Sequence, residues 1–178
     1  MRLSRSLFTV VAALGLPGIA SAAVTPVVED WKIALGWNQT ILPASSFGKS
    51  VGSFTPPAGF ESAPAALATT NNLAVSSAIG KPGGTFICQD TIWGGVCGYA
   101  VQPLNECILL ESPWLKTISS FGPDPGATCF AFASGDCNSG NAQWSFTFPG
   151  DDTGGLATTT PWNDKLTSFA CVASQSVA

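Results

Sequence analysis

The C-terminal half of the chain contains two stretches that repeat the same order of features. The first covers residues 86–122 and the second covers residues 128–171. Each has an aromatic-and-cysteine run, a second cysteine eight or nine residues later, a glycine, a proline turn, a Pro-Trp pair and a final hydroxyl-Ser-Phe. Because the order is the same in both stretches, it indicates a duplicated four-strand unit.

Short apolar runs separated by turn residues predict the strands of these units. The runs are TFICQD, VCGYAV, CILLE, TISSFG, TCFAF, QWSFTF and KLTSFACV. Trp144, Phe146 and Phe148 alternate with Ser145 and Thr147, which is the period of a half-buried strand. Gly-Gly and Pro-Gly segments between the runs are typical of turns. Seven or eight short strands predict an all-β domain over residues 81–178, and two four-strand units can form a two-sheet Greek-key sandwich.

The first 22 residues have the pattern of a secretory signal peptide. Arg2 and Arg5 form a basic start, residues 7–16 are apolar, and Ala20-Ser21-Ala22 is a small-residue cleavage site. We therefore expect a secreted, extracellular protein. The apolar run is too short to cross a bilayer, so we expect no membrane anchor.

Residues 23–80 form an Ala-, Ser-, Pro- and Thr-rich N-terminal extension without cysteine. Such a composition predicts a poorly structured or partly β segment. Within it, residues 27–42 differ, because Trp31, Ile33 and Leu35 alternate with Lys32 and Ala34. This alternation predicts one or two strands that dock onto the later domain; the alternative is a short disordered segment with chance alternation.

The cysteines fit an oxidising compartment. An even number of cysteines in a secreted chain predicts disulfides. The chain has no Cys-x-x-Cys pair and no histidine, which argues against zinc and against a thioredoxin-type redox site. Asn38-Gln39-Thr40 is one N-glycosylation sequon. The six cysteines are Cys88, Cys97, Cys107, Cys129, Cys137 and Cys171.

Charge and composition exclude or disfavour several functions. Without Arg2 and Arg5, five of the seven basic residues remain against eleven acidic ones, a net charge of −6. A nucleic-acid binder needs a basic face to neutralise phosphates, and this chain cannot supply one. The protein is predicted not to be an enzyme, because it has no histidine and its acids show no pairing in sequence. The scattered acids of the domain are Asp90, Glu106, Glu111, Asp124 and Asp136.

The repeated pattern resembles the βγ-crystallin superfamily, whose domains are paired Greek-key motifs of this length. The resemblance covers residues 84–174. In that family an aromatic-to-glycine stretch opens each motif, and a late serine folds over a hairpin. Residues 93–95 (Trp-Gly-Gly) and 132–140 are similar to these openings, although the second is longer than the family's usual spacing.

Many microbial members of that family bind calcium through a clamp of the form Asn/Asp-Asn/Asp-x-x-Ser/Thr-Ser, once per motif. Residues 163–168, Asn-Asp-Lys-Leu-Thr-Ser, match it at every position. Residues 115–120, Leu-Lys-Thr-Ile-Ser-Ser, keep the two serines but lack both acidic or amide positions. Oxygen ligands of this kind suit Ca²⁺. The alternative is a turn in which the side chains cap backbone amides.

The resemblance implies two sites that are each built from both motifs. One site would combine the carbonyl of Thr117, the hydroxyl of Ser119 and the carboxylate of Asp164, and Asn163 precedes that carboxylate in the clamp. The other would combine the carbonyl of Lys165 and the hydroxyl of Thr167 with position 116, which is a lysine. Since an ammonium has no acceptor, we expect one usable calcium site and one dead or weakened site.

The disulfide pairing has fifteen alternatives for six cysteines. Repeat symmetry suggests Cys88–Cys97 and Cys129–Cys137 as local links, which leaves Cys107–Cys171. The resemblance makes this last pair plausible, because the third strand of one motif lies beside the last strand of the other in the family's fold.

The leading functional hypothesis is a small secreted, non-enzymatic, disulfide-stabilised module that binds one calcium ion for stability. Its partner would be an unidentified extracellular molecule or a cell-wall component, with no nucleic acid and no membrane insertion. The alternative is a secreted effector, similar to a toxin or a protease inhibitor, that uses the same scaffold without calcium. The proline-rich residues 122–126 could serve as an inhibitory loop or as a stiff connector between the motifs.

Overall fold

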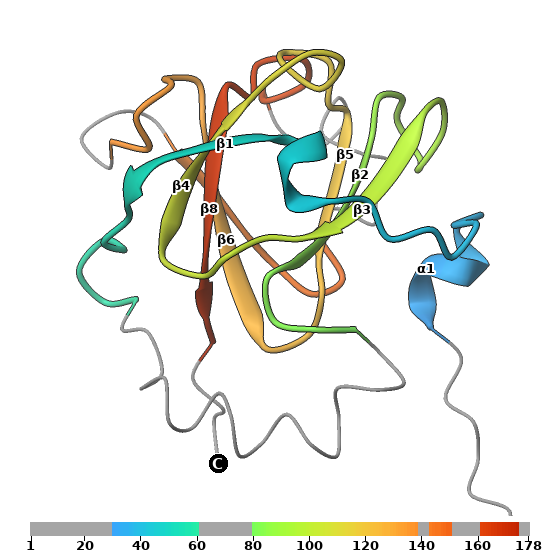
Figure 1. Ribbon diagram of the computed structural model, residues 1–178, viewed down its shortest axis with the longest axis horizontal. Helices are drawn as coiled ribbons and strands as arrows, with labels where there is room; N and C mark the ends of the chain where they lie inside the picture. Colours follow the sequence, from blue (N-terminus) through green and yellow to red (C-terminus); the bar gives the residue numbers. More distant parts are fainter. Residues whose placement is uncertain (1–29, 61–79, 139–142, 151–160, 175–178) are drawn as a thin grey trace, which may run out of the picture.

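The computed structural model describes residues 30–60, 80–138, 143–150 and 161–174, so the predicted signal peptide lies outside the described residues (Figure 1). These residues form eight strands, a single-turn helix and a 3₁₀ turn. The helix is α1 (Trp31–Ala34), and the 3₁₀ turn covers Ala44–Ser46. The strands are β1 (Gly48–Ser53), β2 (Gly84–Cys88), β3 (Cys97–Val101), β4 (Glu106–Leu110), β5 (Ser120–Pro123), β6 (Ala127–Phe132), β7 (Gln143–Thr147) and β8 (Ser168–Ala173).

The strands form two antiparallel sheets, ordered β3-β2-β5 and β1-β4-β8-β6-β7. β4 belongs to the first repeat by sequence but pairs with β8, the last strand of the second repeat. This exchange interlocks the two repeats. After β7 the chain returns to the smaller sheet, where the Pro149 carbonyl packs closely against Gly122 of β5. The predicted two-sheet Greek-key sandwich of two repeated motifs is therefore confirmed.

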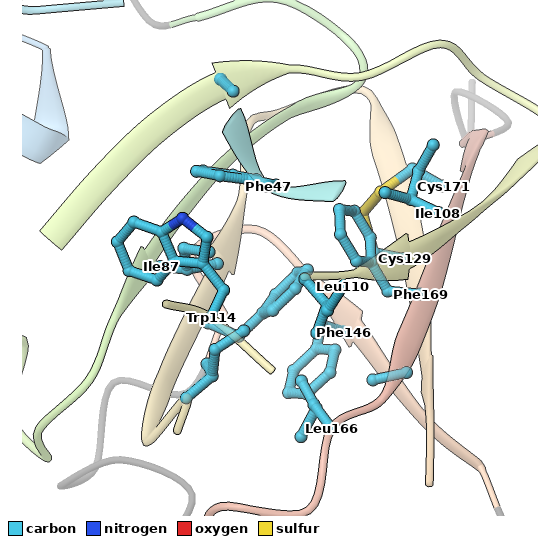
Figure 2. Close-up of a cluster of buried hydrophobic side chains, with 14 of the residues drawn as sticks. Phe47, Ile87, Ile108, Leu110, Trp114, Cys129, Phe146, Leu166, Phe169 and Cys171 are labelled. Carbon is cyan, nitrogen blue, oxygen red and sulfur yellow. A yellow bond between two sulfur atoms is a disulfide. The ribbon is translucent and has the colours of Figure 1, made fainter. Parts of the chain in front are cut away.

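The main core fills the space between the sheets (Figure 2). Strand side chains alternate between faces, so β4, β6 and β8 each contribute alternate residues to this core, as Cys129 and Ala131 of β6 show. Phe121 of β5, for example, stacks on Phe146 of β7 at a ring separation of 4.8 Å. The loops before β5 and β8 add Ile118 and Leu166, both fully buried. Burial of each such aliphatic side chain contributes about 1.5–3 kcal/mol.

The outer face of each sheet is covered by the N-terminal extension. Trp31 and Trp37 pack on the smaller sheet, where Trp37 lies 4.9 Å from Tyr99 between ring centroids. Phe54 and Phe60 pack on Phe130 of the larger sheet at 5.4 and 5.0 Å. Every residue of β2, β6 and β8 is consequently buried. The extension therefore wraps the sandwich and completes its hydrophobic layers.

The prediction of a strand within residues 27–42 is wrong for the described part of that segment, residues 30–42. Trp31–Ala34 is instead one turn of helix. The Asp30 side chain caps it by accepting the backbone N–H of Lys32 at 3.0 Å, and Gly36 follows in the left-handed conformation. A cap and a glycine therefore outweigh five residues of alternation. No helix of the described residues is long and apolar enough to cross a membrane.

The strand of the extension lies further along, in β1, which no sequence pattern predicted. Gly48 is buried, and the other five residues of β1 are exposed. β1 joins the larger sheet by pairing with β4, with one irregularity in register between Ser50 and Gly52. Because an edge strand is held by its backbone pairing, its side chains need no alternating apolar pattern.

The disulfides agree with one predicted pair and contradict the other two. Cys88–Cys97 joins β2 to β3, as predicted. The remaining cysteines pair as Cys107–Cys137 and Cys129–Cys171, so the predicted Cys129–Cys137 and Cys107–Cys171 links are wrong. The sequence expectation placed the strands correctly but not the side chains.

The face of the sheet on which each cysteine lies explains why the pairing differs from the predicted one. Cys107 on β4 lies opposite Ala170, so Cys171, one residue further along β8, points to the other face. Cys171 faces the main core, directly across from Cys129 on β6. Cys107 lies on the outer face with Cys137. In the second repeat Phe146, not Cys137, lies opposite Cys129, because its first hairpin is longer.

Candidate metal centre

The two loops that carry the clamp pattern have matching backbones. Lys116 donates its N–H to the carbonyl of Leu166 at 3.0 Å, and Asp164 donates its N–H to the carbonyl of Ile118 at 3.2 Å. Lys116 and Asp164 both adopt the left-handed conformation, with φ of 57° and 55°. These reciprocal bonds relate the loops by a local two-fold axis. Position 116 is therefore the structural equivalent of position 164, as the sequence repeat predicted.

Buried side chains fix both loops on the core. Trp114 and Trp162 are 3% and 8% exposed, and Ile118 and Leu166 are fully buried. The Trp114 indole also donates to the carbonyl of Ser46 at 2.9 Å, which ties the first loop to the N-terminal extension. The loops are thus held rigidly before any ion binds, as a metal site requires.

Ser119 and Asp164 come together across the two motifs. The Ser119 hydroxyl donates to Oδ1 of Asp164 at 3.3 Å. Asp164 is exposed, so its carboxylate is accessible from solvent. Its other oxygen, Oδ2, accepts the amide N–H of Asn163 at 2.9 Å. Three of the predicted ligand residues therefore share one small surface site.

Asn163 contributes an acceptor without a partner. Its Oδ1 is buried, and it makes no hydrogen bond within the part of the chain that the structure describes. An unpaired buried carbonyl oxygen is costly unless water or a cation satisfies it. The amide contacts the Asp164 carboxylate through its Nδ2, and its Oδ1 is an unsatisfied acceptor on the same side chain.

Thr117 can contribute only its backbone carbonyl. Its hydroxyl donates to the carbonyl of Pro113 at 2.6 Å and accepts from the side-chain amide of Gln89 at 3.4 Å. The side chain is thus committed to its own loop. The predicted ligand set uses the carbonyl of Thr117 and the hydroxyl of Ser119, so the commitment of the Thr117 side chain leaves that prediction unaffected.

The equivalent oxygens of the second site also lie together. The Thr167 hydroxyl donates to the carbonyl of Lys165 at 3.4 Å. The acidic position of this site is occupied by Lys116, which is exposed. The second site therefore has a hydroxyl and a carbonyl but lacks the carboxylate that the first site has.

The donor set suits a hard cation. The described residues contain no cluster of three or more His, Cys, Asp or Glu side chains. The first site offers one carboxylate together with hydroxyl, amide and carbonyl oxygens. Calcium accepts such mixed oxygen ligands and completes its shell with water.

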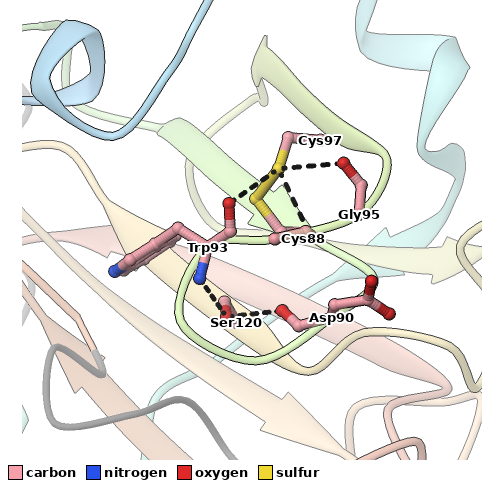
Figure 3. Close-up of a disulfide and its surroundings, with 7 residues drawn as sticks. Cys88, Asp90, Trp93, Gly95, Cys97 and Ser120 are labelled. Atoms are coloured by element: carbon pink, nitrogen blue, oxygen red, sulfur yellow. Dashed lines mark hydrogen bonds between the residues drawn. A yellow bond between two sulfur atoms is a disulfide. The ribbon is translucent and has the colours of Figure 1, made fainter.

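The final serine of each clamp has a structural role instead. Ser120 accepts the N–H of Trp93 at 3.2 Å and donates to the carbonyl of Asp90 at 2.9 Å (Figure 3). Ser168 accepts the N–H of Cys137 at 3.3 Å and donates to the carbonyl of Ser134 at 2.7 Å. Each serine therefore closes the first hairpin of its motif.

Two other predicted sites lie away from this centre. Asn38 is exposed, and its side chain accepts the N–H of Thr40 at 3.0 Å, so the sequon lies on an accessible turn. Asp124, in the middle of residues 122–126, is fully buried. Most of this segment is therefore packed as a connector between the motifs, and only Gly126 is exposed.

Sequence reasoning missed a buried pair of charges. Lys32 of α1 is fully buried and pairs with Asp124, which was counted among the scattered acids. Tyr99 donates its hydroxyl to the same carboxylate. Burial and this neighbouring carboxylate raise the pKa of Tyr99 well above its ordinary value. No sequence pattern indicated the pair, because its members are 92 positions apart.

Comparison with solved structures finds βγ-crystallin domains. A βγ-crystallin domain from Flavobacterium johnsoniae is 21% identical over 52% of this chain and 98% of its own, with a TM-score of 0.38. The N-terminal domain of Protein S is 13% identical over 51% of this chain and 96% of its own, with a TM-score of 0.37.

A third structure is a βγ-crystallin domain of the Abundant Perithecial Protein from Neurospora crassa in its Ca²⁺-bound form. It is 11% identical over 53% of this chain and 93% of its own, with a TM-score of 0.37. No protein-family model and no curated protein matches the chain. The similarity concerns the fold alone, which the strand order described above establishes independently.

Proposed function

We propose that this chain is a secreted, non-enzymatic, disulfide-stabilised module that binds one calcium ion for stability. The observation that carries the proposal is the contact between Ser119 and Asp164, 3.3 Å apart and from different motifs. A cation bound between them would join the two motifs at the loops that precede β5 and β8. The predicted ligands are the carboxylate of Asp164, the hydroxyl of Ser119 and the carbonyl of Thr117, with Asn163 beside them.

The affinity should be modest. Calcium affinity rises with the number of charged ligands and the rigidity of the site. Here the loops are rigid, but the first site has a single carboxylate, Asp164. We therefore expect a dissociation constant of about 10⁻⁴–10⁻³ M, the range of extracellular modules. Such an affinity suits a protein that acts outside the cell, where three disulfides also persist.

The ion would stabilise the fold by mass action. The two loops come together only in the folded state, so calcium would bind the folded protein and not the unfolded chain. At a calcium concentration one hundred times the dissociation constant, the free energy of unfolding should rise by about 2.7 kcal/mol. The module would then present the folded surface to an extracellular partner or to the cell wall.

Calorimetric titration of the oxidised protein with calcium tests this function. We expect close to one equivalent of binding, with a higher melting temperature in calcium. The Asp164→Ala variant should lose both effects relative to its own calcium-free baseline, which should itself be lower because alanine at this left-handed position also removes the Ser119 contact. The absence of heat and of any shift in the wild-type protein would refute the proposal.

A gain-of-function variant provides the matched control. Lys116→Asp places a carboxylate at the two-fold equivalent of Asp164, next to the hydroxyl of Thr167 and the carbonyl of Lys165. This variant should bind two equivalents of calcium. If it still bound one, the oxygens around Thr167 would not form a site, and the crosswise arrangement would be wrong.

A further inference from the structure

Lys32 is a buried lysine whose amine is held between two carboxylates. Its Nζ lies 2.8 Å from Oδ1 of Asp124 and 2.9 Å from Oδ1 of Asp30. Asp30 is fixed in place because the same oxygen caps α1. The side chains of Lys32 and Asp124 have no exposed area, whereas that of Asp30 is 20% exposed. One nitrogen therefore contacts both acids inside the protein.

The carboxylate of Asp124 is held by donors on both oxygens. Oδ1 accepts the indole N–H of Trp31 at 3.3 Å in addition to the Lys32 amine. Oδ2 accepts the hydroxyl of Tyr99 at 2.5 Å and the backbone N–H of Lys81 at 2.9 Å. The orientation of the carboxyl group relative to the amine is thus fixed from several directions.

Aromatic rings and glycines enclose the pair. The Lys32 Nζ lies 5.3, 5.1 and 4.5 Å from the ring centroids of Trp31, Trp37 and Tyr99. The backbone approaches so closely that a Cβ on Gly80 or Gly84 would lie 2.1 or 2.2 Å from atoms of the Asp124 carboxylate. The amine and the carboxylate therefore meet in a tightly packed, low-dielectric site.

We propose that Lys32 and Asp124 condense into an intramolecular isopeptide bond. In this reaction Nζ of Lys32 forms a bond to Cγ of Asp124, and the bond from Cγ to Oδ1 breaks. The ammonium and the carboxylate together become an amide and one molecule of water. The two protons that Nζ gives up leave on the departing oxygen, so no oxidant, reductant or co-reactant is needed.

The surrounding groups fit the steps of this condensation. Asp30 contacts Nζ and can accept its proton, which frees the lone pair for attack, and can then return the proton to the departing Oδ1. Tyr99 and the N–H of Lys81 hold Oδ2, the oxygen that becomes the amide carbonyl and carries negative charge in the tetrahedral intermediate. They therefore act as an oxyanion hole.

Burial supplies a reason for the reaction to proceed. A desolvated ion pair loses its hydration and recovers only part of that cost from mutual attraction. Conversion of both charges into a neutral amide removes this cost and releases water to the solvent. Fixed contact between the reacting groups also replaces an encounter in solution, which accelerates such reactions strongly. The bond would lock the N-terminal extension onto the connector between the motifs.

Mass spectrometry of the reduced, denatured protein tests the inference. We expect a mass below that calculated for the mature, reduced chain by one water, and a branched peptide that links the segment around Lys32 to that around Asp124. Trypsin should fail to cleave after Lys32. Two outcomes would overturn the proposal. One is a deficit of one water without the branched peptide. The other is the full calculated mass after reduction of protein that had formed its three disulfides.

Three variants separate the bond from a simple ion pair. Lys32→Arg keeps a cation but lacks the nucleophilic amine, so it should retain the full mass. Asp124→Asn should lose one ammonia in place of one water if the condensation occurs. Asp30→Asn keeps a residue suited to the helix cap and should form the bond at least tenfold more slowly, since it cannot accept the proton. Equal rates in Asp30→Asn and wild type would exclude Asp30 as the base.

Discussion

Removal of one disulfide at a time should rank the three crosslinks by the length of chain that each closes. The pairs Cys88–Cys97, Cys107–Cys137 and Cys129–Cys171 are separated by 9, 30 and 42 residues. The loop-closure relation then gives losses of about 2.6, about 3.6 and about 4 kcal/mol when each pair is replaced by alanine. The loops closed by Cys107–Cys137 and Cys129–Cys171 overlap in sequence. Neither disulfide shortens the loop that the other closes, so the two losses can be calculated separately.

Burial widens the difference between the first and the last pair. Cys129 and Cys171 are 0% and 1% exposed within the main core, so alanine at these positions also leaves a cavity. Cys97 is only half-buried and leaves a smaller one. The Cys129→Ala/Cys171→Ala protein should therefore lose at least about 1.4 kcal/mol more than the Cys88→Ala/Cys97→Ala protein, a tenfold difference in the unfolding equilibrium.

Guanidinium unfolding of the three double variants measures these losses, with linear extrapolation to water. Because small domains have a total stability of about 5–15 kcal/mol, the variant without Cys129–Cys171 should unfold at a clearly lower denaturant concentration than the variant without Cys88–Cys97. A variant without Cys88–Cys97 that proved as unstable as the one without Cys129–Cys171 would refute both the loop-length reasoning and the core position of the second pair.

Two further predictions concern buried hydroxyl groups. Tyr99 is the single tyrosine of the chain, and its pKa is raised above all by burial. Its contribution to stability should be complete below pH 10 and be lost as the pH rises further. Ultraviolet absorbance should therefore show no tyrosinate in the folded protein near pH 10, and reversible ionisation there without unfolding would contradict this. Ser168→Ala should lower the free energy of unfolding by about 1–3 kcal/mol, because one backbone N–H and one backbone carbonyl of the hairpin lose their partner. Ser120→Ala should have the same effect for the same reason. Exposed Ser50→Ala is the control in chemical unfolding, and equal stability of the Ser50 and Ser168 variants would exclude the hairpin role.

The sequence predicted the features that depend on local patterns. Turn residues and apolar runs placed the seven strands from β2 to β8, and the repeat predicted their arrangement as two motifs. The equivalence of positions 116 and 164 also followed from the repeat, and the reciprocal hydrogen bonds of the two loops agree with it. Whether this pair of loops holds calcium stays a prediction.

Local patterns failed where the partner of a segment decided its structure. The alternation around Trp31 predicted a strand, but the Asp30 cap and the packing of Trp31 on Phe86 favoured a helical turn. β1 has almost no apolar pattern, because pairing with β4 holds it in place. The packing of Trp31 and the pairing of β1 are not visible in the segments alone, whereas the Asp30 cap is a local signal that the alternation obscured.

The sequence by itself determined the seven strands from β2 to β8 and their order along the chain, because turn chemistry and side-chain alternation act within a few residues. Only the tertiary structure decided which cysteines pair and which charges meet. A shift of one residue reverses the face on which a side chain lies, so Cys171 meets Cys129 and not Cys107. Lys32 and Asp124 meet because the extension folds over the outer face of a sheet, and that long-range packing has no local signature.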